Sequence, residues 1–135
     1  DIGFRVLRID SSNFGDTYET TDSYTQEKLA FFRDNLKDDR SDLDLLFQVL
    51  PAFRIPYSAS IEEIEVAGKH AYNVNDGQLV ACFDVDVSTE CIEIIARMRP
   101  LYAVLRDASL ADDATAANFE ELFKTFSPNT VRRVI

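Results

Sequence analysis

The sequence predicts an α/β fold: a single domain over residues 1–135 with one mixed sheet of about five or six strands and four helices. Three observations predict it. Between residues 61 and 84, short alternating segments are joined by turns that contain Gly, which is typical of an antiparallel meander. A strand, a helix and a second strand then follow closely over residues 78–105, the order of a right-handed parallel βαβ unit. A further helical stripe of apolar residues precedes the C-terminus.

The first elements are a strand and two helices. Residues 4–9 alternate and carry Phe, Val, Leu and Ile, which predicts a strand, and a polar loop follows over residues 11–23. Residues 25–36 have apolar side chains at helical spacing. A second helix is capped by Ser41, ends at Pro51, and is apolar on both sides, so we expect it to be buried between layers. Its main stripe is Leu43, Leu46, Phe47 and Leu50, with Leu45 and Val49 on the far side.

The second half of the chain supplies the remaining strands and helices. The meander comprises strands over residues 61–66, 70–74 and 78–84, the last apolar on both faces as expected of a central strand. Ser88 caps a helix with the stripe Cys91, Ile94, Ile95 and Met98, and residues 101–105 form a buried strand. Asp112 or Asp113 opens the last helix, whose stripe is Phe119, Leu122, Phe123 and Phe126. Residues 131–135 return as a closing strand.

The charge balance disfavours several classes of partner. With 24 acids against 14 bases the formal net charge is −10, which repels both a phosphate backbone and an anionic membrane surface. Arg132 and Arg133 are too few to form a nucleic-acid patch. No apolar run reaches the roughly 20 residues of a membrane helix. Cys82 and Cys91 lack CxxC spacing, which favours reduced core thiols and a cytoplasmic location.

Three carboxylates form the strongest candidate for chemistry. Asp84 and Asp86 follow one strand of the predicted βαβ unit and Asp107 follows the other, at the edge where open α/β sheets bind ligands. Carboxylates at such an edge are suited to Mg²⁺ and to phosphoryl transfer or hydrolysis. The structural alternative is that Asp86 caps the next helix together with Ser88 and that Asp107 opens a turn. No surrounding pattern completes a phosphatase signature, so we assign no metal site.

Other polar residues do not form a recognisable catalytic set. His70 is the only histidine, and a single histidine without matching ligands is typical of a packed or exposed residue. Ser11 and Ser12 lack the G-x-S-x-G elbow of a nucleophilic serine, and no glycine-rich phosphate loop occurs. The ten Phe residues mostly supply a core, although an exposed apolar patch used in association is a second possibility. A solvated, aggregation-resistant strand edge is indicated by Glu62, Glu63 and Glu65.

Five runs of residues, in order along nearly the whole chain, carry a family resemblance. They are GFRVLRIDSSNF, DNLKDDRSDLDLLFQVL, AGKHAYNVNDGQLVACFD, PLYAVLRDAS and FEELFKTFSPNT. The chain resembles the C-terminal region of the methylation subunit of type III restriction-modification systems, which are site-specific adenine DNA methyltransferases. The resemblance departs at residues 51–60 and at Val85 and Asp86, where relatives often have Gly; this leaves open a separate role for Asp86.

The resemblance implies a noncatalytic assembly domain of a larger subunit, which agrees with a chain that begins at Asp1 without Met. In the family, a D-P-P-Y motif handles the target adenine and an F-x-G-x-G motif holds S-adenosylmethionine, and neither motif occurs in this sequence. We therefore expect no catalytic or cofactor-binding residue in this segment. Methyl transfer and DNA contact are expected of the parent subunit. The expected partners are the rest of that subunit, a second copy of it and the restriction subunit.

Overall fold

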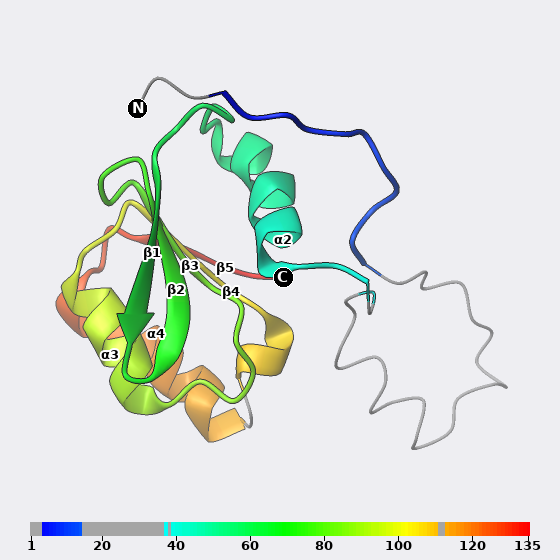
Figure 1. The fold of residues 1–135 in the computed structure, drawn as a ribbon. Coiled ribbons are helices and arrows are strands. Elements are labelled where there is room, and N and C mark those ends of the chain that lie inside the picture. Colours follow the sequence, from blue (N-terminus) through cyan, green and yellow to red (C-terminus); the bar gives the residue numbers. More distant parts are fainter. Residues whose placement is uncertain (1–3, 15–36, 38, 111–112) are drawn as a thin grey trace, which may run out of the picture. The chain divides into compact units, whose positions relative to one another are not determined.

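The computed structural model describes residues 4–14, 37, 39–110 and 113–135. The chain forms two compact units, unit 1 over residues 1–58 and unit 2 over residues 59–135. The predicted helix over residues 25–36 lies outside the described residues. The predicted α/β class is confirmed: unit 2 holds one mixed sheet of five strands in the order β1-β2-β3-β4-β5, with two helices of its own (Figure 1).

The first three strands form the predicted meander. β1 (Ile61–Val66), β2 (Lys69–Val74) and β3 (Leu79–Cys82) pair antiparallel, with Glu65 opposite His70 and Tyr72 opposite Ala81. The β1–β2 turn places Gly68 at φ +80°, and the β2–β3 turn places Gly77 at φ +87°. These left-handed values favour glycine, so the glycines in the two turns predict the hairpins of the meander.

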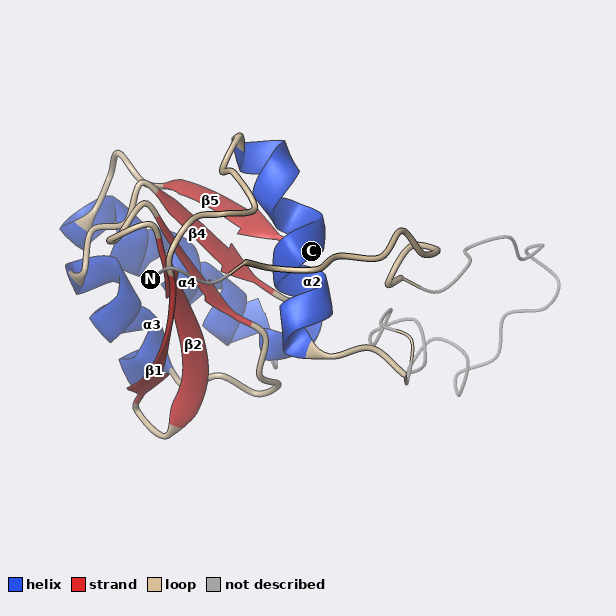
Figure 2. Ribbon diagram, turned by 45° about the horizontal axis from the view of Figure 1, so that its top comes forward, coloured by secondary structure: helices blue, strands red, loops and turns tan. Residues whose placement is uncertain are grey.

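Two parallel crossovers complete the sheet. α3 (Thr89–Arg97) connects β3 to β4 (Tyr102–Leu105), and α4 (Asp113–Phe126) connects β4 to β5 (Val131–Val134). Both strand pairs are parallel, which confirms the predicted βαβ unit and adds a second one. The predicted closing strand is β5. The two helices lie on the same face of the sheet (Figure 2).

The core of unit 2 lies between this sheet face and the two helices. From the sheet, Ala71, Val80 and Cys82 contribute side chains that are at most 1% exposed. From the helices, Ile92 and Phe123 pack into the same cluster. Every residue of β3 is buried, as predicted for a central strand.

The amphipathic stripes differ in detail from the predicted ones. In α3 the buried residues are Cys91, Ile92, Ile95 and Ala96, whereas the predicted Ile94 and Met98 are 37% and 40% exposed. Because Ile92, Ile94 and Ile95 nearly adjoin, more than one helical stripe is compatible with the sequence, and packing against the sheet selects between them. Leu101 precedes β4 and is exposed rather than buried.

Unit 1 is described mainly through α2 (Asp42–Val49) and the 3₁₀ turn η2 (Leu50–Phe53) that continues it. Ser41 is the N-cap, as predicted. The buried residues of α2 are Leu45, Leu46 and Val49, whereas Leu43 of the predicted stripe is 44% exposed.

The predicted strand over residues 4–9 is wrong, because these residues have no strand assignment. We call residues 4–9 the N-terminal segment. Alternation shows that a segment is suited to a sheet, but a strand also needs a neighbour to supply hydrogen bonds. Within the described chain, no backbone–backbone hydrogen bond joins residues 6–9 to another residue.

Candidate functional site

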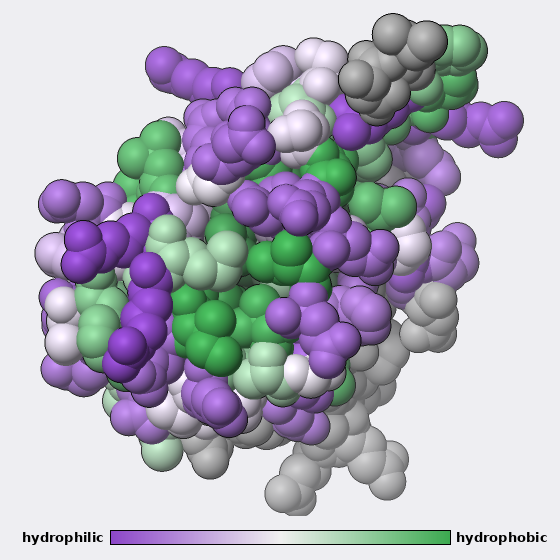
Figure 3. Space-filling view, turned by 60° about the vertical axis from the view of Figure 1, so that its left-hand side comes forward, coloured by the Kyte–Doolittle hydropathy of each residue, from purple (hydrophilic) through white to green (hydrophobic). Residues whose placement is uncertain are grey.

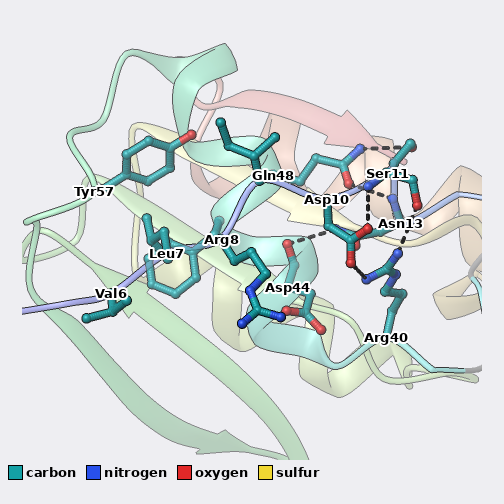
Figure 4. Close-up of a pocket in the computed structure, with 13 residues that line it drawn as sticks. Val6, Leu7, Arg8, Asp10, Ser11, Asn13, Arg40, Asp44, Gln48 and Tyr57 are labelled. Carbon is teal, nitrogen blue, oxygen red and sulfur yellow. Dashed lines mark hydrogen bonds and ion pairs between the residues drawn. The ribbon is translucent and has the colours of Figure 1, made fainter.

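A cavity of about 580 Å³ in unit 1 is the first candidate site (Figure 4). It is bounded by residues 6–13 on one side and by Arg40, α2 and Tyr57 on the other. One part of its lining is polar, with Asp10, Ser11 and Asn13, and another part is apolar, with the rings of Phe47 and Tyr57.

The cap of α2 organises part of the polar lining. The Ser41 N–H donates to Asp44 Oδ2 over 2.8 Å, and the Asp44 N–H donates to Ser41 Oγ over 3.3 Å, so both groups at the helix start are satisfied. The bond from the Ser41 N–H lowers the pKa of Asp44 below its ordinary value of 3.8. Asn13 attaches to the same turn, because its Nδ2 donates to the Asp44 carbonyl over 2.9 Å and its N–H donates to Gln48 Oε1 over 3.0 Å.

An ion pair holds the residues just before Asn13. Arg40 Nη1 donates to Asp10 Oδ2 over 2.9 Å, and this bond lowers the pKa of Asp10. Ser11 Oγ accepts from Arg40 Nη2 over 3.0 Å and from Lys37 Nζ over 2.9 Å. Asp10 is therefore an ionised, neutralised carboxylate, and Ser11 contacts cations rather than a base.

The apolar part of the cavity anchors the other end of the N-terminal segment. Arg5 Nη1 donates to the Tyr57 carbonyl over 2.7 Å, and its guanidinium carbon lies 5.9 Å from the ring centroid of Phe47. The segment is thus fixed near both ends within unit 1. Its apolar side chains are nevertheless exposed, with Phe4 at 90%, Val6 at 83% and Ile9 at 100%.

The described lining of the cavity attaches residues 5–13 to α2 and its flanking residues. The described lining contains no His or Cys, and the Oγ of Ser11 accepts from Arg40 and Lys37. An acyl-transfer or hydrolytic site of the usual kind needs a nucleophile with a base within hydrogen-bond distance. The contacts made here instead fix an extended segment on a helix.

The three predicted carboxylates lie in the loops that follow β3 and β4. The Asp84 Oδ2 accepts the backbone N–H of His70 over 2.8 Å. Asp86 has φ +50°, and its N–H donates to the Ala108 carbonyl over 3.1 Å. Asp107 begins the 3₁₀ turn η3 (Asp107–Ser109). The two loops are therefore joined, as the topology predicted, but no group of three or more His, Cys, Asp or Glu side chains suited to a metal ion occurs in the described part of the chain.

A buried polar pair at this sheet edge was not predicted. Arg106 is 7% exposed and donates from Nη1 to the Phe83 carbonyl over 3.3 Å. Ser109 is fully buried; its Oγ accepts the Arg106 N–H over 3.2 Å and donates to the Asp84 carbonyl over 2.6 Å. These hydrogen bonds join the segment that follows β4 to the segment that follows β3. The only sequence signal was an Arg placed directly after a buried strand.

The remaining candidates are a surface histidine and two core thiols. His70 is exposed, and its Nδ1 lies 3.7 Å from Glu63 Oε1. Cys82 and Cys91 are free and buried, which agrees with the predicted reduced state. A hydrogen bond with Cys91, together with burial, raises the pKa of Cys82. A buried thiol whose pKa is raised, as that of Cys82 is, is a poor nucleophile.

Charged residues at the two sheet edges differ. On β1, all three glutamates are exposed, as predicted. On β5, Arg132 lies 3.4 Å from Glu120, whereas Arg133 is exposed.

Apolar side chains also gather on the face of the molecule shown in Figure 3, where hydrophilic side chains surround them. In unit 2 the exposed large apolar residues are Val85, Ile94, Met98, Leu101, Val131 and Val134.

Comparisons with known proteins assign no relative: no family profile, curated protein or solved structure matches the chain. Among the residues that the structure describes, no helix combines the length and apolar character needed to cross a membrane.

Proposed function

We propose that this chain is a noncatalytic assembly domain from the C-terminal region of a type III restriction-modification methylation subunit. The parent would transfer a methyl group from S-adenosylmethionine to adenine in DNA, in the cytoplasm. The observation that carries the proposal is the five-part resemblance, which covers nearly the whole chain in the order of the family.

Two features of the structure support an assembly role. The N-terminal segment presents Phe4, Val6 and Ile9 to solvent, and apolar groups exposed together are typical of association surfaces. The contacts that line the cavity of unit 1 fix this segment along α2 and Tyr57. An interaction domain explains both features without any chemistry in this chain.

The acidic balance supports a position away from DNA. With a net charge of −10, the domain repels the phosphates that the rest of the subunit must approach. Arg132 is partly neutralised by Glu120, which leaves few cations for a phosphate contact on that strand. We therefore place DNA contact and methyl transfer in other parts of the parent.

The test uses the full methylation subunit with and without the segment that corresponds to residues 1–135. We expect deletion to convert a dimeric subunit into a monomer, or to release the restriction subunit, in light scattering. A truncated subunit that stays dimeric and still binds its restriction partner would refute the assembly role. A coding sequence upstream of Asp1 without D-P-P-Y and F-x-G-x-G would refute the family assignment.

A further inference from the structure

The N-terminal segment has the character of a strand but pairs with no strand in the described part of the chain. Its sequence, FRVLRI, places apolar side chains on both faces of an extended chain and carries positive charge only at Arg5 and Arg8. It is held extended along unit 1 by the contacts of Arg5 with Tyr57 and of Asp10 with Arg40. A segment fixed in this form loses little further conformational freedom when it joins a sheet.

Strand β1 is an edge strand with the opposite charge. Among the residues that the structure describes it pairs only with β2, so one of its two sides has no strand partner there. Its sequence, IEEIEV, is also six residues long, and its only charged residues are the exposed Glu62, Glu63 and Glu65. Ile61 and Ile64 are half-buried and extend the apolar surface to this edge.

The charges of the N-terminal segment and of β1 are complementary in both possible strand orientations. In an antiparallel pair, Arg5 faces Glu65, Arg8 faces Glu62, and Val6 faces Ile64. In a parallel pair, Arg5 aligns with Glu62 and Arg8 with Glu65, because the charged positions are symmetric under reversal. Opposite charges and apolar residues directly across from each other are the pairs that stabilise a sheet. The third glutamate, Glu63, faces an apolar residue in either case and lies beside His70 instead.

We propose that the N-terminal segment of one copy of this chain adds to the open edge of β1 in a second copy. Every copy carries both a segment and an edge, and the proposed exchange is reciprocal, which gives a symmetric dimer with two added strands. The exchange buries the exposed Phe4 and Val6. This inference rests on the proposed assembly function and names its partner and surface.

The same charges exclude the competing pairings. Two β1 edges would bring glutamates together, and two N-terminal segments would bring arginines together, and like charges directly opposite destabilise a sheet. Strand β5 is also a poor acceptor, because its charged residues are Arg132 and Arg133. The acidic edge therefore selects a basic strand.

The test is a charge exchange, followed by sedimentation velocity over micromolar to submillimolar concentrations. Arg5→Glu with Arg8→Glu reverses all four Arg–Glu pairs of the dimer, as does Glu62→Arg with Glu65→Arg. Because Arg5 also binds the Tyr57 carbonyl, Arg8→Glu alone, which keeps that bond, should reverse two pairs and weaken dimerisation by about 25-fold. At roughly fivefold for each pair, either double variant should weaken dimerisation by on the order of 500-fold. Mixing the two variants should restore a heterodimer, and the chain with all four substitutions should dimerise alone, in either strand orientation.

The matched control for Glu62→Arg with Glu65→Arg is Glu90→Arg with Glu121→Arg, which makes the same change in net charge at exposed positions of α3 and α4. It should leave dimerisation within about threefold of the wild type. Circular dichroism establishes that each variant is folded, and the recovery in the mixture could not come from unfolded chains.

The outcomes distinguish failure of the proposed pairing with β1 from failure of the proposed assembly function. A wild-type chain that stays monomeric, or charge variants that dimerise as well as the wild type, would overturn the pairing with β1. In the second case the assembly function stands and another surface carries it. Failure of the assembly function itself is read separately, from a full subunit whose association survives deletion of this domain.

Discussion

Ser109→Ala removes the hydroxyl that joins the ends of β3 and β4. Ser109 is fully buried, and its Oγ both accepts the Arg106 N–H and donates to the Asp84 carbonyl. Alanine leaves these two backbone groups without that partner, at about 1 to 1.5 kcal/mol for each. We therefore expect the free energy of unfolding to fall by about 2–3 kcal/mol.

The assay is equilibrium unfolding in urea, followed by circular dichroism. With an m-value of about 2 kcal/mol/M, the midpoint should fall by about 1–1.5 M while the m-value itself stays constant. The control is Thr125→Ala, because Thr125 donates to the Glu121 carbonyl over 2.9 Å on an exposed helix face. That variant should stay within about 0.5 kcal/mol of the wild type. A similarly small change for Ser109→Ala would show that the hydroxyl does not join the two strands.

Three further predictions concern the core, the helix cap and the thiols. Phe123→Ala should lower the free energy of unfolding in urea by about 3–5 kcal/mol, because this ring is 1% exposed; a change below about 1 kcal/mol would contradict its place in the core. The lowered pKa of Asp44 means that its stabilisation is complete above its ordinary value of 3.8 and is lost as the pH falls through the lowered value. Asp44→Asn should therefore flatten the acid loss of helicity measured by circular dichroism below that pH, and an unchanged acid limb would refute the role of the charge. Cys82 and Cys91 are buried, so Ellman's reagent at about pH 8 should label them only after unfolding in urea; rapid labelling of the native chain would contradict their burial.

Local chemistry explains why the meander and the starts of two helices could be predicted from the sequence. Gly68 and Gly77 adopt left-handed backbone conformations that mark the turns of the meander. Ser41 and Ser88 cap α2 and α3 through their own side chains. Each of these signals acts over a few neighbouring residues, so it does not depend on how distant parts of the chain pack together.

Features that depend on tertiary contacts between distant residues could not be predicted from the sequence. The burial of Arg106 and Ser109 follows from the meeting of two loops, which brings the carbonyls of Phe83 and Asp84 within reach. A polar residue after a strand carries no local sign of this environment. The carboxylates were placed at the correct edge, yet the hydrogen bond from the His70 N–H to Asp84 depends on side-chain geometry that spacing does not encode.

The net charge of −10 does not prevent two copies from meeting, because it acts over a different distance from the paired residues. At physiological ionic strength, screening reduces interactions between exposed charges beyond about 8 Å. Repulsion between acids spread over two molecules is therefore weak, whereas pairs in contact keep their interaction. The local pattern then decides which surfaces can approach. On the N-terminal segment that pattern is entirely positive, and on β1 it is entirely negative. The acid excess is thus compatible with self-association, provided that the approaching strand is basic.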